Sequence, residues 1–388
     1  MGHLVDPAPV ELVKGEKIME FEELDIPEWF SGNYIEENAG RWDYRPDVSA
    51  LWRKAVPYRN THHIGPARDQ TLDVRLVGVD LQKDFCLPQG TLFVAGRAGN
   101  GAVRDSARIA EFIYRNLRIL TRIQLTLDTH RLFQIFFAPF WVTREGGPLD
   151  AHTLIQLSDD GDVLVNTDLE GNILHREIKP NPFAADWVCC GDYGWLKQQV
   201  RFYCASLAKA GKYTLYLWPP HCLEGSDGHS ITGVVHEAVI FHTYVRIAKP
   251  DLYTKGDNNL TENYDPAEVE VRQRWDGKGA VGDARDDRFF RDLKAADAYI
   301  VSGQAASHCV KSMIDGLLKE VMEKEPELVK KIYILTDCMS PVTVRNDHGD
   351  IVADFTGETE AAMARFKDMG VNLVTSTTPM RLWPGLTL

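Results

Sequence analysis

One cysteine of this chain stands where a thiol can become a nucleophile. The apolar run 298–301 predicts a buried strand, which breaks at Ser302-Gly303 shortly before Cys309. Apolar residues at three-and-four spacing then predict a helix that begins near Cys309: Val310, Met313, Ile314, Leu317, Leu318 and Val321. Unpaired N–H groups and the helix dipole at such a start favour a thiolate. The alternative is a small buried residue at a strand–helix junction, because free cysteine is among the most buried residue types.

Ionisable side chains also follow three other predicted strands. Asp80 ends a strand predicted over 73–80, Asp128 and His130 follow one over 122–127, and His221 follows one over 213–217. A single acid or histidine at a strand end is commonly structural. Because the carboxyl ends of parallel strands meet at one edge of a sheet, the four ends can converge on one crevice, and convergence favours a functional site.

From about residue 72 onward, predicted strands alternate with amphipathic helices. Further strands are predicted over 331–336 and 371–375, and helices over 103–117, 234–248 and 358–368. Such alternation predicts a three-layer α/β fold, with a mostly parallel six-stranded sheet flanked by helices on both faces.

Two segments depart from this alternation. Residues 1–71 are rich in Pro, Glu and Trp and are expected to form an N-terminal arm or cap. Residues 72–388 then form one domain, which carries an inserted subdomain at about 131–212. The insertion contains a predicted hairpin with an Asp-Gly turn between 153–157 and 163–165.

Composition limits the partners and the compartment. The chain has 388 residues, 43 Lys plus Arg against 56 Asp plus Glu, a net charge of −13 and no basic cluster, so neither nucleic acid nor an anionic membrane is an expected partner. Seven cysteines form no C-x-x-C pair, which favours a reducing cytoplasm over a disulfide framework. Several glutamates near the N-terminus, and the lack of any uncharged apolar run of about 18 residues, argue against a signal peptide or membrane span.

Five ordered motifs carry a resemblance to a known family. The stretch Val79-Asp80-Leu81-Gln82-Lys83-Asp84-Phe85-Cys86, with Gly90-Thr91-Leu92 after it, resembles the opening motif of the isochorismatase-like cysteine hydrolases. The other motifs narrow the resemblance to nicotinamidases (pyrazinamidases): Asp128-Thr129-His130, Trp218-Pro219-Pro220-His221-Cys222, Lys255-Gly256 with Tyr264, and Gly303-Gln304-Ala305-Ala306-Ser307-His308-Cys309. The resemblance covers roughly residues 72–130 and 213–376.

The resemblance implies catalytic roles. Cys309 would attack an amide carbonyl, Asp80 would accept the thiol proton, and Lys255 would hold both groups in place. A thiol with a pKa near about 8.5 is mostly protonated at neutral pH, so it needs such a base or cation beside it. The oxyanion hole would be the backbone N–H groups of Ala305 and Cys309, next to a non-proline cis peptide bond at Gln304–Ala305.

A metal and an aromatic slot are implied in the same way. Asp128, His130 and His221 match the ligands of the family, and one carboxylate with two imidazoles suits zinc or another first-row divalent ion. Some relatives have a further histidine where this chain has Phe136. The slot for a heteroaromatic ring would be formed by Phe85, Trp218, Tyr264 and His308. Taken alone, each histidine and aromatic residue is equally compatible with a structural role.

The implied function is a cysteine amidohydrolase that converts nicotinamide, or a similar small amide, to the acid and ammonia through a thioester. The insertion and the long stretch 265–284 keep two alternatives open. One is an amidase for an aliphatic amide or carbamoyl compound without a functional metal. The other is a non-catalytic ligand-binding or assembly homologue. A homo-oligomer is expected.

Overall fold

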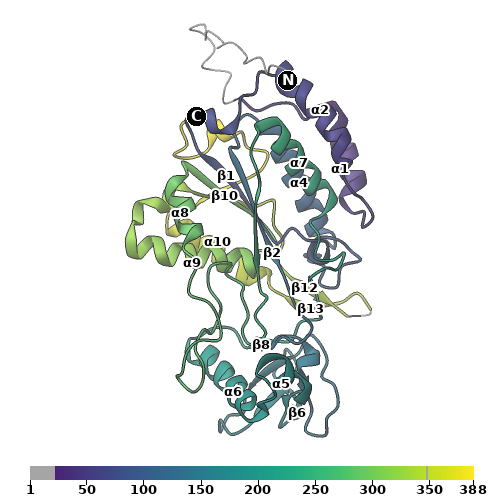
Figure 1. Cartoon of the computed structure of the whole chain (residues 1–388), viewed down its shortest axis with the longest axis vertical. Coiled ribbons are helices and arrows are strands. Elements are labelled where there is room, and N and C mark those ends of the chain that lie inside the picture. The colour runs from purple at the N-terminus through teal and green to yellow at the C-terminus, as the bar shows by residue number, and fades with distance from the viewer. Residues whose placement is uncertain (1–21, 347) are drawn as a thin grey trace, which may run out of the picture.

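The computed structural model describes residues 22–346 and 348–388 and is built around one parallel sheet (Figure 1). The strand order is β14-β11-β10-β1-β2-β9, and every neighbouring pair is parallel. The strands of the sheet are β1 (Val74–Val79), β2 (Arg122–Asp128), β9 (Asp251–Lys255), β10 (Ala298–Gly303), β11 (Ile332–Leu335) and β14 (Asn372–Val374). The predicted α/β class with a six-stranded parallel sheet is confirmed.

The sixth strand of this sheet differs from the one expected. The prediction placed 213–217 in the sheet, and this was wrong: only β8 (Leu215–Tyr216) is extended there, and it pairs antiparallel with β4 in a separate sheet. The edge next to β2 is instead β9, which the sequence analysis missed. As an edge strand, β9 leaves Leu252 half-exposed and buries Lys255, so it lacks the continuous apolar run of a central strand.

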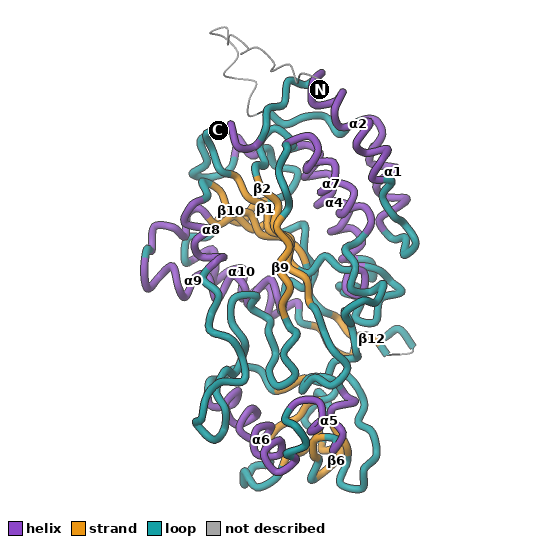
Figure 2. The backbone as a smooth tube through the Cα atoms, viewed as in Figure 1, coloured by secondary structure: helices purple, strands orange, loops and turns teal. Residues whose placement is uncertain are grey.

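Helices cover both faces of the sheet (Figure 2). The α4 and α7 helices lie on one face with α1 and α2 outside them, and α8, α9 and α10 lie on the other. Side chains of β1 alternate between the two layers: Leu76 joins the core under α4, and Val77 the core under α9. The helices are α1 (Gly32–Ala39), α2 (Val48–Thr61), α3 (Lys83–Cys86), α4 (Gly101–Arg115), α7 (Gly233–Arg246), α8 (Arg288–Ala295), α9 (Cys309–Lys324) and α10 (Thr356–Asp368).

The described part of the N-terminal segment packs on the helical layer. Phe30 is buried and stacks on Tyr114 of α4, with ring centroids 4.5 Å apart. The Tyr44 hydroxyl donates a 2.7 Å hydrogen bond to Glu237 of α7. Residues 22–71 therefore lie against the domain as an outer layer. The remainder of the expected arm, with its glutamates at 11, 16 and 20, lies outside the described residues.

Residues 131–212 form most of a second lobe, at the bottom of Figure 1. The predicted hairpin is confirmed as antiparallel β4 and β5, whose turn contains Gly161 at φ +73. With β6 and β8 these strands make a four-stranded sheet. The elements of the lobe are β3 (Trp141–Val142), β4 (Leu154–Leu157), β5 (Leu164–Thr167), β6 (Ile173–Arg176), β7 (Lys179–Pro180), α5 (Pro182–Val188) and α6 (Tyr193–Lys209).

A small hairpin of β12 (Thr343–Arg345) and β13 (Ile351–Asp354) projects from the domain after β11. No helix in the described ranges is long and apolar enough to cross a membrane.

Candidate active site

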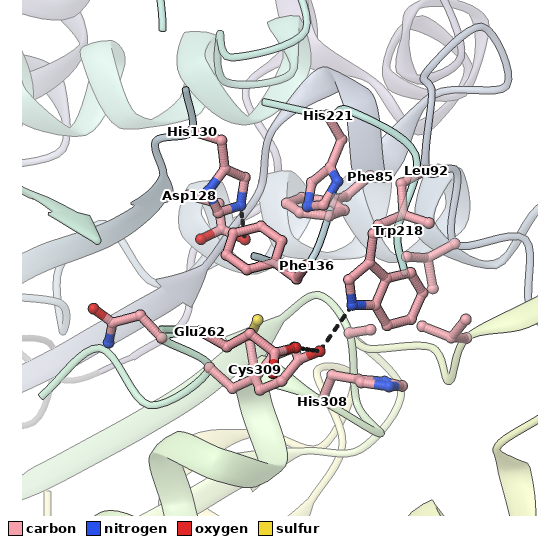
Figure 3. Close-up of a pocket in the computed structure, with 15 residues that line it drawn as sticks. Phe85, Leu92, Asp128, His130, Phe136, Trp218, His221, Glu262, His308 and Cys309 are labelled. Atoms are coloured by element: carbon pink, nitrogen blue, oxygen red, sulfur yellow. Dashed lines mark hydrogen bonds and ion pairs between the residues drawn. The ribbon is translucent and has the colours of Figure 1, made fainter. Parts of the chain in front are cut away.

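A pocket of about 500 Å³ lies between the start of α9 and the carboxyl ends of β1, β2 and β9. Figure 3 shows His130, His221 and Asp128 across the pocket from Cys309. Most of the predicted site residues line it: Phe85, Asp128, His130, Trp218, His221, Tyr264, Ala305, His308 and Cys309. The other two, Asp80 and Lys255, are buried. The structure thus brings all the predicted site residues to one place.

A buried lysine joins the predicted nucleophile to two carboxylates. Lys255 Nζ lies 3.5 Å from Cys309 Sγ, 2.9 Å from Asp80 Oδ2 and 2.7 Å from Asp128 Oδ1. Asp80 directly follows β1 and Lys255 ends β9, so the parallel sheet delivers both to the first residue of α9. Asp80 also accepts a 2.7 Å hydrogen bond from Thr126 Oγ1 on the intervening strand β2. Asp80 and Cys309 also lie within 4.8 Å of each other, so the arrangement gathers a thiol, a carboxylate and an ammonium in one buried group.

Burial sets the protonation of this group. Burial opposes the charge on Lys255, but the carboxylates of Asp128 and Asp80 outweigh it and raise the pKa of the amine well above its usual value. Burial also raises the pKa of the Asp80 carboxyl, which makes Asp80 a stronger base. Burial raises the pKa of the Cys309 thiol well above its ordinary value, although Lys255 opposes this. The resting form is therefore a thiol, not the thiolate that the helix start alone favoured, and it needs a base to be activated.

Two backbone N–H groups beside the thiol are free to donate. The Gln304–Ala305 peptide bond is cis, as expected. Within residues 22–346 and 348–388, neither the Ala305 N–H nor the Cys309 N–H has a protein acceptor. Because both residues line the pocket, their N–H groups can donate to a ligand oxygen near Sγ.

Asp128, His130 and His221 form a compact donor set. Their potential ligand atoms all lie within 4.8 Å of one another, and all three side chains are buried. His130 Nδ1 lies 2.9 Å from the Gly256 carbonyl oxygen, and His221 Nδ1 lies 2.8 Å from that of Pro219. Since a carbonyl oxygen only accepts, each Nδ1 carries a proton, and Nε2 is the nitrogen of each ring that can ligate an ion; His130 Nε2 lies 3.2 Å from Asp128 Oδ2. The set fits a divalent ion such as zinc.

Local backbone explains why this donor set is compact. A Cβ at Gly256, which has φ +83, would come 2.7 Å from both Asp128 Oδ1 and His130 Cε1, so only glycine fits after Lys255. We expected His221 to follow a strand of the central sheet, and this was wrong. His221 comes from a loop after β8, which belongs to a separate sheet. That loop is tied to the end of β2, because the His130 N–H donates to the Cys222 carbonyl at 3.0 Å.

Phe136 lies beside His130, at the sequence position where a fourth protein ligand would stand. Its ring lies 5.0 Å from that of His130 in an edge-on contact. Among the described residues, the group of Asp128, His130 and His221 contains no fourth histidine, cysteine or acid. The donor set is therefore a three-ligand set with room for an exogenous ligand.

Aromatic side chains enclose the space between this donor set and the thiol. Trp218 Nε1 donates a 2.8 Å hydrogen bond to the Tyr264 hydroxyl, which orients both rings. The His308 ring lies 5.3 Å from Trp218 and 5.7 Å from Tyr264. Phe85 packs 5.2 Å from His221 on the opposite wall. These residues form a narrow, largely apolar space suited to a flat ring.

Glu262 is a pocket residue that the sequence analysis missed. It is 2% exposed and accepts 2.8 Å hydrogen bonds from the hydroxyls of Tyr264 and of Tyr203 on α6. Burial raises the pKa of its carboxyl to about 8. Glu262 therefore links the inserted lobe to the pocket wall. In the sequence it stands in a polar stretch, where a glutamate is indistinguishable from a surface residue.

Glu262→Gln should flatten the dependence of stability on pH. The native protein holds a proton on Glu262 up to about pH 8, whereas the unfolded chain loses it near 4.5. The unfolded state then binds fewer protons, so the free energy of unfolding should fall as pH rises between these values, by roughly 5 kcal/mol at most. Urea unfolding at pH 5 to 8 measures this slope. An unchanged slope in Glu262→Gln, matching the exposed control Glu224→Gln, would contradict the assignment.

No family model matches the sequence, and no curated protein matches it. Solved structures do resemble it. Yeast nicotinamidase Pnc1p bound to nicotinaldehyde is 17% identical with a TM-score of 0.45, covering 78% of this chain and 99% of that chain. A nicotinamidase/pyrazinamidase of Acinetobacter baumanii is 16% identical, covering 79% and 98%, with a TM-score of 0.42. A Pyrococcus horikoshii pyrazinamidase in complex with zinc is 15% identical, covering 78% and 99%, with a TM-score of 0.39. At these values the likeness concerns the fold and does not extend to substrate or residue roles.

Proposed function

We propose that this protein is a cysteine amidohydrolase that converts nicotinamide, or a similar small heteroaromatic amide, to the acid and ammonia. The observation that carries the proposal is the contact of Lys255 with Cys309, Asp80 and Asp128 at once. Asp128 belongs both to this group and to the metal-type donor set, so the nucleophile and the donor set share one pocket.

The chemistry follows from the positions of these groups. Cys309 Sγ attacks the amide carbonyl carbon while Asp80 accepts the thiol proton, and the carbonyl oxygen becomes an oxyanion held by the Ala305 and Cys309 N–H groups. Asp80 returns the proton to the leaving nitrogen as the C–N bond breaks, releasing ammonia and leaving a thioester. Asp80 then takes a proton from water, which attacks the thioester carbonyl; the C–S bond breaks, Asp80 returns the proton to Cys309 Sγ, and the acid is released. Lys255, 2.9 Å from Asp80 Oδ2 and 3.5 Å from Cys309 Sγ, holds the base beside the sulfur and favours the ionised carboxylate that each proton transfer starts from.

Asp128, His130 and His221 would hold the divalent ion, with zinc the leading candidate. When bound, the ion supplies a Lewis acid that a pyridine nitrogen can ligate. The aromatic walls at Trp218 and Phe85 would hold the ring flat, with its carboxamide toward Cys309. The homo-oligomer and the cytoplasmic location stay predictions.

Ammonia release from a panel of amides tests the proposal. Nicotinamide, pyrazinamide and simple aliphatic amides are assayed with and without a chelator. Turnover of nicotinamide that is lost with the chelator supports the proposed function. Turnover of aliphatic amides alone, indifferent to the chelator, would favour the metal-independent amidase. The absence of turnover with every amide would favour a non-catalytic homologue.

Removing one imidazole should remove the metal. His130→Ala deletes one of three ligands, so we expect zinc affinity to fall at least about 100-fold and nicotinamide turnover to fall with it. Metal content after dialysis against a weak chelator gives the direct measurement. His236→Ala on α7 is the matched control and should retain the ion, because His236 lies outside the donor set. Equal metal content in both variants would refute the donor set.

A further inference from the structure

A buried carboxylate that neither lines the pocket nor touches Cys309 lies behind the predicted oxyanion hole. Asp105 is on the core-facing side of α4 and is only 2% exposed. Most of the residues around it on that face are apolar, among them Ile109 and Phe112. Its nearest cation is Arg108, 3.6 Å from Oδ1. A carboxylate buried in this way is costly unless hydrogen-bond donors satisfy it, so the donors indicate what Asp105 does.

The donors to Asp105 come from two loops. Asp105 Oδ2 accepts a 2.9 Å hydrogen bond from Gln304 Nε2 and a 2.6 Å hydrogen bond from Ser340 Oγ. Gln304 Oε1 in turn accepts from the Ser340 N–H at 3.3 Å. The side chains of all three residues and the Ser340 N–H therefore close a ring between α4, the loop before α9 and the loop after β11. Each of the three is buried.

This ring lies next to the Gln304–Ala305 peptide bond, which carries the Ala305 N–H. The Gln304 N–H donates to the Val79 carbonyl at the end of β1, and the Ala306 N–H donates to the Ser340 carbonyl, both at 2.8 Å. The residues on each side of Ala305 are thus anchored, while the Ala305 N–H itself has no acceptor in the described ranges. A Cβ at Gly101 would meet Ser340 Cβ at 2.8 Å, so a glycine at the start of α4 lets Ser340 pack closely against that helix.

We propose that Asp105 is a positioning residue that holds, through Gln304 and Ser340, the Gln304–Ala305 peptide in the orientation that presents the Ala305 N–H to the reaction oxyanion. This rests on the proposed function, in which that N–H stabilises charge that develops only during attack. Such donors are effective because they are oriented before the reaction, and a small displacement is costly in rate. Burial raises the pKa of the Asp105 carboxyl to about 6, so at neutral pH it is ionised and accepts both bonds.

The first test is a split between kcat and KM. Asp105→Leu should lower kcat for nicotinamide by about 100-fold, because it removes the oxygen that accepts from both Gln304 Nε2 and Ser340 Oγ, and should change KM by less than about threefold. Nicotinic acid should bind as tightly as before. Nicotinaldehyde should bind about 100-fold more weakly, because addition of the Cys309 thiol to its carbonyl creates an oxygen in the oxyanion position. Gln304→Met removes the same link and should have the same effects.

A conservative variant distinguishes positioning from general stability. Asp105→Asn removes the charge but keeps a carbonyl oxygen that can accept from both Gln304 Nε2 and Ser340 Oγ, as Oδ2 does. This variant should keep most of the native kcat. Asp292→Asn is the control, because it alters a partly buried carboxylate bound to Arg75 and Gln124, which lie toward the amino ends of β1 and β2. It should lower the melting temperature and leave kcat unchanged.

Hydrogen exchange keeps the proposal testable if the native protein hydrolyses none of the amides. In that case the proposed function fails, and the Asp105 ring is judged by exchange of residues 303–309. Asp105→Leu should speed exchange of the Ala306 N–H, and Asp105→Asn and Asp292→Asn should not. Unchanged exchange in Asp105→Leu would overturn the proposal, as would unchanged kcat and nicotinaldehyde affinity in an active protein. Loss of either readout in Asp105→Asn to the extent seen in Asp105→Leu would also overturn it.

Discussion

Cys309→Ala should lower kcat for nicotinamide by about 10⁴-fold or more while leaving the protein folded. The proposed reaction forms and breaks a bond at Sγ, so no other group can replace the nucleophile. The removed atom lies 3.5 Å from Lys255 Nζ, and the lysine keeps its two carboxylates in the variant. Rates of ammonia release give the loss, and acid quenching of the native enzyme should trap a nicotinoyl thioester that mass spectrometry finds on the peptide containing Cys309.

Cys204→Ala is the matched control for this change. Cys204 is also buried and unpaired, but it lies on α6 in the inserted lobe. Its loss should cost some stability through the cavity it leaves and should not alter kcat. Turnover that survives Cys309→Ala, or a thioester on another cysteine, would refute the assignment of the nucleophile.

Lys255→Met should impair both stability and turnover. The cation lies between Asp80 and Asp128, and its loss leaves two buried carboxylates whose oxygens approach within 4.8 Å. Breaking a buried ion pair in this way costs about 3–5 kcal/mol of unfolding free energy. Turnover should fall by at least about 1,000-fold, because the base and the thiol lose the group that holds them. Denaturant unfolding and steady-state kinetics measure the two effects separately.

A second substitution separates the structural from the chemical contribution of Lys255. Asp80→Asn together with Lys255→Met removes one of the two like charges and should recover much of the lost stability, but none of the turnover. Lys311→Met on α9 is the control: among the residues that the structure describes, Lys311 forms one ion pair, an i,i+4 pair with Asp315, and its loss should cost less than about 0.5 kcal/mol. A stable, active Lys255→Met protein would contradict the proposed role.

Elements with strong local patterns were predicted closely. The α9 helix begins at Cys309, where the three-and-four spacing of its apolar residues placed it. The central strands β1 and β10 were equally clear, because burial on both faces requires continuous apolar runs. The edge strand β9 was missed, because its side chains face partly into solvent and its buried residue is a lysine.

The inserted lobe explains a second limit of prediction. The segment before Trp218 has the apolar pattern of a strand, and β8 is a strand, but it pairs with β4 of the insertion. An alternation of apolar and polar residues identifies a strand but does not show which other strand it pairs with. His221 therefore reaches Asp128 and His130 from a loop, which only the packing of the lobe against the sheet decides.

By itself, the sequence determined the parallel α/β class, the start of the Cys309 helix and the residue types available for chemistry, because these depend on local periodicity and on motifs within a few residues. Tertiary structure alone decided which charges touch. Lys255, Glu262 and Asp105 look like solvent-exposed residues in their local segments, yet all three are buried against groups far along the chain. Their roles come from long-range contacts in a low-dielectric interior, where a partner changes both the cost of burial and the pKa.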